Sequence, residues 1–190
     1  MKRPIAFLAG ALFCVAGCVT PHVTESPVRK VDFSAYKSVH LTVERIHAQI
    51  GANDGGYAEE LTSLFELLLQ RRLKSLGYLV VPESGELQLD VAITAVKPGS
   101  AAARFWVGFG AGRAVFTYDA KFLDSGGAAL GNFSGGRSHT GMEIGESFAD
   151  KDQILTLAAT RAVSQIEQFI QNDGQLPEIK RPVVVNPNAR

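Results

Sequence analysis

Two segments with a strict two-residue alternation constrain the fold of this chain most strongly. Residues 87–94 read Leu-Gln-Leu-Asp-Val-Ala-Ile-Thr, and residues 114–122 place Ala, Phe, Tyr, Ala and Phe at every second position. Successive side chains of a strand point to opposite faces, so each segment predicts a half-buried strand with one wet face.

Two longer segments have the period of an amphipathic helix. The apolar stripes consist of Leu61, Leu64, Phe65, Leu68 and Leu69 in the first, and of Ile154, Leu157, Ala158, Ala162, Ile166, Phe169 and Ile170 in the second. We expect Asn53 or Asp54 to cap the start of the first helix, and Gly77 and Gly174 to end the two helices.

Shorter runs predict further strands at residues 39–43, at 78–81 before Pro82, and more weakly at 128–138. The order β-α-β-β-β-β-α predicts an α+β fold, in which a mostly antiparallel sheet of four to five strands has two helices packed on one face. The other face is expected to meet water and to carry Gln88, Asp90, Thr117, Asp119 and Lys121.

The first 18 residues have the layout of a targeting signal. Lys2 and Arg3 precede an apolar stretch from Ile5 to Phe13, and the small residues that follow end in Gly17 and Cys18. The apolar run of about ten residues is too short for a membrane span, which needs roughly 20. It therefore predicts a removable segment.

The run Val15-Ala16-Gly17-Cys18 resembles the lipobox of bacterial lipoproteins. The resemblance implies cleavage between Gly17 and Cys18, a diacylglycerol on the Cys18 sulfur, and acylation of the new amino terminus. Several acyl chains hold a protein firmly on a bilayer. Val19 in place of an aspartate implies the outer membrane of a Gram-negative cell, with the chain facing the periplasm. The alternative is an ordinary secretory signal with a coincidental cysteine.

We divide the chain accordingly. Residues 1–17 are the signal peptide, 18–31 the lipidated cysteine and a flexible tether, 32–174 a single domain, and 175–190 an extended tail. The formal net charge is zero, and loss of Lys2 and Arg3 makes the remainder slightly acidic. This balance argues against nucleic acid as a partner, because binding of the phosphate backbone requires a basic surface.

A glycine-rich segment lies between the two alternating segments. It is not a dinucleotide-binding loop, because Arg113 stands where the third glycine belongs and a strand follows. One interpretation is a bulged connection or core segment. The other is an apolar interaction segment that contacts lipid, a partner or a second copy, formed by Arg104, Phe105, Trp106, Gly108, Phe109, Gly110, Gly112 and Arg113.

The sequence predicts no catalytic residues, metal site or cofactor. Of the four histidines, only His40 and His47 lie within ten residues of each other, and the spacing of a metal site is missing. The acids near the predicted turns show no pattern that selects a general acid and base, and they are Asp119, Asp124, Glu143, Glu146, Asp150 and Asp152.

The glycine-rich segment also carries a family resemblance. Arg104, the run from Gly108 to Ala114, the strand after it and the pair Asp124 and Gly127 resemble a family of bacterial lipoproteins classed as a domain of unknown function. The resemblance implies an envelope lipoprotein with a small α/β domain, and it supplies no catalytic residues. The element order is also remotely similar to small periplasmic α/β domains of envelope lipoproteins.

Three functions compete on these grounds. We expect a non-enzymatic binding or accessory module, held at the membrane by its lipid, for another envelope protein. The alternative is a self-assembling or pore-related lipoprotein, a homo-oligomer in which residues 105–116 pair with neighbours or meet the bilayer. An envelope hydrolase ranks third, since it would need a cleft that gathers Asp119, Asp124, Glu143 or His139.

Overall fold

The computed structural model describes residues 22–25, 30–49, 55–97, 114–139 and 151–176. In chain order the elements are β1 (His22–Glu25), the short 3₁₀ helix η1 (Phe33–Ala35), β2 (Ser38–Gln49), α1 (Gly55–Ser75), β3 (Leu79–Val81), β4 (Leu87–Lys97), β5 (Ala114–Asp124), β6 (Ala129–His139) and α3 (Lys151–Gln171). From β2 onward this is the predicted order.

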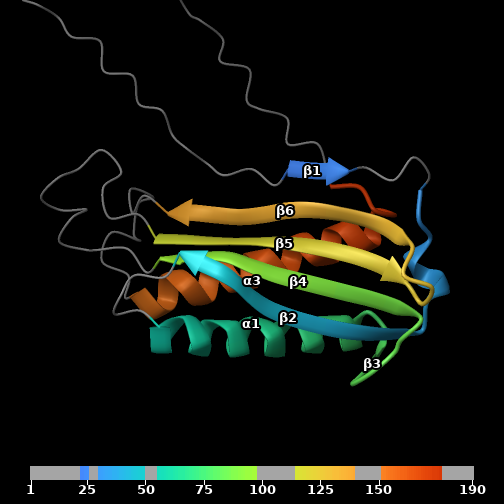
Figure 1. Ribbon diagram of the computed structural model, residues 1–190, viewed down its shortest axis with the longest axis horizontal. Helices are drawn as coiled ribbons and strands as arrows, with labels where there is room; N and C mark the ends of the chain where they lie inside the picture. Colours follow the sequence, from blue (N-terminus) through green and yellow to red (C-terminus); the bar gives the residue numbers. More distant parts are fainter. Residues whose placement is uncertain (1–21, 26–29, 50–54, 98–113, 140–150, 177–190) are drawn as a thin grey trace, which may run out of the picture.

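The strands form one six-stranded sheet in the order β1-β6-β5-β4-β2-β3 (Figure 1). The pairs β1–β6, β4–β5 and β5–β6 are antiparallel, whereas β2 is parallel to both β3 and β4. The sheet is therefore mixed and has more strands than the four or five expected. The parallel pairing of β2 with β3 follows from the helical crossover α1 between them, since a crossover returns the chain in its original direction.

Both helices cover one face of the sheet, as the predicted α+β class requires (Figure 1). The burial of β4 alternates from Leu87 to Ile93, with the apolar side chains in the core. At one end of the core the rings of Phe33, Phe122 and Phe169 meet, and the centroids of the last two lie 4.9 Å apart. The fold class is confirmed, and none of the described helices lies on the opposite sheet face.

The connection from β3 to β4 crosses the start of β2. Gly85 lies so close to β2 that a Cβ atom there would stand 2.6 Å from the backbone nitrogen of His40. The backbone nitrogen of Glu86 donates to the Ser38 hydroxyl at 3.0 Å. Because glycine has no Cβ atom, the connection can pass this close to the backbone of β2. The parallel strands β3 and β4 can therefore lie on either side of β2.

The helix ends agree with the predicted glycines. Gly77 and Gly174 both have positive φ angles, of 95° and 83°, and follow α1 and α3. The predicted caps Asn53 and Asp54 lie outside the described residues. Arg72 of α1 pairs with Glu167 of α3, which ties the two helices together.

The predicted tether, residues 18–31, contains an element that the sequence analysis did not expect. Its residues His22–Glu25 form β1, which pairs with β6 at the edge of the sheet. Within the described part of the chain, neither long helix is apolar enough to span a bilayer.

Candidate functional site

Most of the residues singled out in the sequence lie outside the described part of the chain. They are Gly17, Cys18, the whole segment from Arg104 to Arg113, and the acids Glu143, Glu146 and Asp150. Their predicted roles stay predictions, and the candidate site must be built from the sheet.

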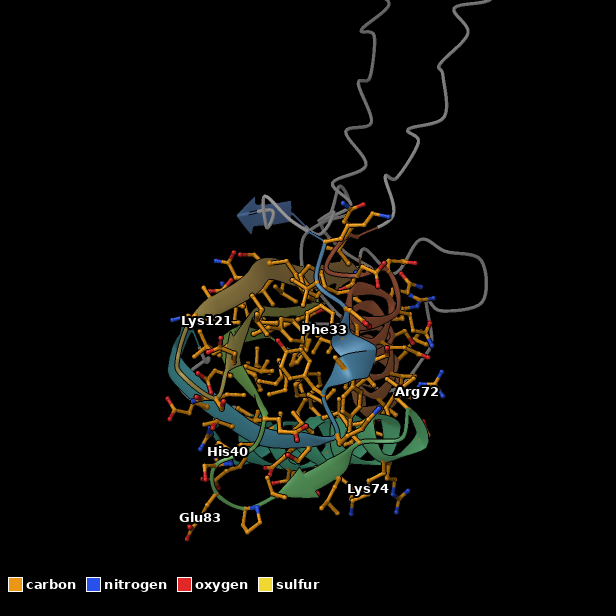
Figure 2. The ribbon with its side chains drawn as sticks, turned by 90° about the vertical axis from the view of Figure 1, so that its right-hand side faces the viewer. Phe33, His40, Arg72, Lys74, Glu83 and Lys121 are labelled. Atoms are coloured by element: carbon orange, nitrogen blue, oxygen red, sulfur yellow. The ribbon has the colours of Figure 1, made fainter. Side chains whose placement is uncertain are left out.

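The sheet face turned away from the helices is hollowed over β2, β4, β5 and β6. The hollow has a volume of about 660 Å³. Its polar lining consists of Thr42, Glu44, Gln88, Asp90, Asp119, Lys121, Asn132 and Ser134. We call this surface the open face. Figure 2 shows Lys121 on it, on the side of the sheet opposite the helices.

Strand register arranges the open face in rows. In one row Thr42 lies opposite Asp90, Asp90 opposite Lys121, and Lys121 opposite Asn132. In the next row Glu44, Ala92, Asp119 and Ser134 stand side by side in the same way. Directly opposed residues on one face have Cβ atoms about 5 Å apart, so the first row is a continuous polar strip across four strands, whereas Ala92 interrupts the second row.

The open face is acidic. It carries three carboxylates, Glu44, Asp90 and Asp119, and the single ammonium group of Lys121. The ion pairs between described residues join Arg45 to Glu59 and Arg72 to Glu167, so none involves these four groups. Among the described residues, no ion pair neutralises the charge of these four groups.

One polar atom on the open face is buried without a partner. The side-chain oxygen Oδ1 of Asn132 has no hydrogen bond within the described residues. Leaving a buried acceptor unpaired costs about 1–3 kcal/mol. By contrast, Gln88 Nε2 donates to both carboxylate oxygens of Asp90, at 3.3 and 3.4 Å. The carboxylates make the exposed part of the open face rich in acceptors, whereas the Asn132 oxygen lies buried beneath it.

In the core beneath the open face, Tyr118 connects the sheet to a helix. Its hydroxyl donates to Gln165 Oε1 at 2.8 Å and lies 3.2 Å from the carbonyl oxygen of Ala162, so it links β5 to α3. Burial raises the pKa of Tyr118, which keeps the hydroxyl protonated as a donor. The sheet under the open face is consequently tied to a helix.

Of the acids considered for a hydrolase, Asp119 and Asp124 lie in different parts of the described structure, and Glu143 lies outside the described residues. Asp124 accepts from the backbone nitrogens of Gly126 and Ala128, both at 2.9 Å, and so closes the turn between β5 and β6. Asp119 lies in the hollow, five positions before Asp124 on β5. No group of three metal-ligating side chains occurs among the described residues.

The prediction of the open face was correct but incomplete. Gln88, Asp90, Asp119 and Lys121 line the hollow as expected, and Thr117 bonds to Thr94 at 2.9 Å on the same face. The sequence analysis missed Thr42, Glu44, Asn132 and Ser134. For Asn132 and Ser134 a signal was available, because they flank Phe133 and alternate with it.

A family model described as a domain of unknown function (DUF4410) matches residues 34–142. The match confirms the predicted resemblance to a family classed only in this way, and it spans the four strands that carry the open face. No curated protein sequence matches the chain.

Solved structures with a similar arrangement of the backbone have low sequence identity to this chain. A PelC dodecamer from Paraburkholderia phytofirmans is 16% identical, with a TM-score of 0.45 over 76% of this chain and 96% of that chain. A minor lipoprotein from Acinetobacter baumannii is 12% identical, with a TM-score of 0.37 over 73% and 95%. A DUF4136 family protein from Bacteroides thetaiotaomicron is 10% identical, with a TM-score of 0.39 over 80% and 97%.

Proposed function

The chain belongs to the DUF4410 family of domains of unknown function, and on this premise we propose that it is a non-enzymatic binding module of the bacterial cell envelope. Lipid on Cys18 holds it at the outer membrane, facing the periplasm. Its domain docks another envelope protein on the open face. The lipobox pattern ending in Cys18 supports the anchor, and the open face supports the docking.

The observation that carries the docking proposal is the acidic, acceptor-rich hollow. An antiparallel sheet can leave one face to water. On the open face the carboxylates Glu44, Asp90 and Asp119 outnumber the ammonium group of Lys121. Charge complementarity steers association and selects partners, so the partner presents a basic, donor-rich segment.

A catalytic function is not favoured by this arrangement. General acid–base catalysis needs two groups held within reach of one reacting atom. No hydrogen bond among the described residues links Asp90 to Asp119, and Asp124 is occupied by its turn. We therefore assign the carboxylates to recognition.

The decisive experiment reverses charge on the open face. The variant Asp90→Lys/Asp119→Lys and the matched control Glu60→Lys/Glu83→Lys change the net charge equally, and the control residues are exposed and lie outside the hollow. Full-length tagged protein is crosslinked in intact cells and purified. We expect the control to retain the wild-type partner and the open-face variant to lose at least about tenfold, which corresponds to about 1.4 kcal/mol.

Two results would contradict the proposal. One is recovery of the same protein in equal amounts with both variants, which would place the docking surface elsewhere. The other is the absence of any specifically crosslinked envelope protein from the wild type.

A further inference from the structure

Strand β1 is held almost entirely by the outer edge of β6. His22 lies opposite Ser134 and Glu25 opposite Asn132, so three residue steps on β1 match two on β6 and the register is irregular. Such a bulge leaves one residue unpaired. β1 packs extensively against no other described element (Figure 1).

The edge that receives β1 is much longer than β1 itself. β6 runs from Ala129 to His139 and pairs with β5 along its length, but β1 aligns with it only between Asn132 and Ser134. An edge strand with unpaired backbone groups is a template for another extended chain. The β6 edge is therefore only partly capped by the chain's own strand.

We propose that this edge exchanges strands between copies of the chain, so that His22–Glu25 of one copy pairs with β6 of another. The segment seated on the edge belongs to this same chain, so every copy carries both the strand and the site that receives it. Four residues, 26–29, separate β1 from Lys30, where the described chain continues.

The exchange leaves the core intact. The backbone nitrogen of Val31 donates to the carbonyl oxygen of Asp173 at 3.2 Å, and Phe33 is only 1% exposed. The chain is thus fixed to the domain from residue 31 onward, and only the residues before it change partners. Copies confined to one bilayer surface would meet at high effective concentration, which favours the exchange.

The experiment uses two differently tagged full-length copies expressed together, both in a Cys14→Ser background. One carries His22→Cys and the other Ser134→Cys. Directly opposed residues of an antiparallel pair have Cα atoms about 4.5–5.5 Å apart, which suits a disulfide. The control replaces Ser134→Cys by Thr42→Cys, which lies on the open face but on β2.

We expect a mixed disulfide dimer at least about tenfold more abundant with Ser134→Cys than with Thr42→Cys. Three results would overturn the exchange: a disulfide that forms only within a single chain carrying both His22→Cys and Ser134→Cys, no disulfide in either arrangement, or equal dimer yields with the control. None of these results bears on the docking proposal, because that proposal is tested by crosslinking to a different protein.

Discussion

At the scale of single residues, the contact between Gly135 and Tyr118 shows how closely the sheet is packed. The two residues lie directly opposite each other on β6 and β5. A Cβ atom at position 135 would stand 2.5 Å from Cζ and from the hydroxyl oxygen of Tyr118. The tyrosine ring is fully buried and bonded to Gln165 of α3, so it has little room to yield.

Gly135→Ala should therefore destabilise the domain. Overpacking a rigid core site costs about 1–3 kcal/mol, and the urea midpoint should fall accordingly. Gly56→Ala is the matched control, because nothing lies within 4 Å of a Cβ atom there and the position is helical. Alanine favours a helix over glycine, so the control should be neutral or slightly stabilising. Equal midpoints for Gly135→Ala and wild type would show that the Tyr118 ring moves freely.

At the scale of elements, the short helix η1 joins the amino-terminal segment to the core. Asp32 caps it, accepting from the backbone nitrogen of Ser34 at 3.0 Å and from its hydroxyl at 2.6 Å. The Tyr78 hydroxyl donates to the carbonyl oxygen of Phe33 at 2.9 Å. The hydrogen bonds from Ser34 lower the pKa of Asp32 below its ordinary value of 3.8.

Asp32→Asn keeps an acceptor at the cap but removes its charge, so it tests this pKa shift. A carboxylate with a lowered folded-state pKa stabilises the fold at pH values above 3.8, and the contribution disappears as the pH falls through the folded-state pKa. We expect the melting temperature of the variant to lie slightly below wild type at pH 7 and to approach it as the pH falls from 3.8 through the lowered folded-state pKa. A difference that stays constant over this range would assign the effect to packing.

The elements also show what the sequence can and cannot predict. Alternation located β4 and β5, and the helical period located α1 and α3, because burial of one face imposes these periods on the chain. The sequence pattern did not predict that β2 reaches Gln49, because the charged residues Glu44 and Arg45 interrupt the run of apolar residues. Nor did the local pattern predict β1, a segment of four residues that pairs with a strand far away in the sequence. Pairing partners depend on contacts between segments far apart, which local periodicity does not contain.

For the candidate site the same reasoning applies. Alternation showed which residues of β4 and β5 face away from the core, but the hollow also needs Thr42 and Asn132 from the neighbouring strands. Those neighbours are set by the order of strands in the sheet. The sequence thus predicted the residues of the open face on β4 and β5. Its excess of carboxylates became evident only from the strand order, which places Glu44 of β2 on the same face.

At the scale of the whole molecule, the lipid that we propose on Cys18 would let β1 control how far the domain stands from a bilayer. Cys18 precedes His22 by four residues, so a docked β1 would begin within about 14 Å of that lipid. With β1 released, the twelve residue steps from Cys18 to Lys30 would span up to about 40 Å. Strand exchange would thus set the reach of the open face as well as the contact between copies.

This geometry depends on the anchor, which Cys18→Ser tests against the matched control Cys14→Ser. Lipidation requires the thiol of Cys18, whereas Cys14 lies in the segment that we expect to be removed. In cells fed labelled palmitate, we expect Cys14→Ser to be labelled and processed like wild type, and Cys18→Ser to stay unlabelled and to keep residues 1–17. If Cys18→Ser instead reached mature size and remained with the outer membrane, the chain would be attached in another way. The short reach imposed by a docked β1 would then no longer apply, although the pairing of β1 with β6 would be unchanged.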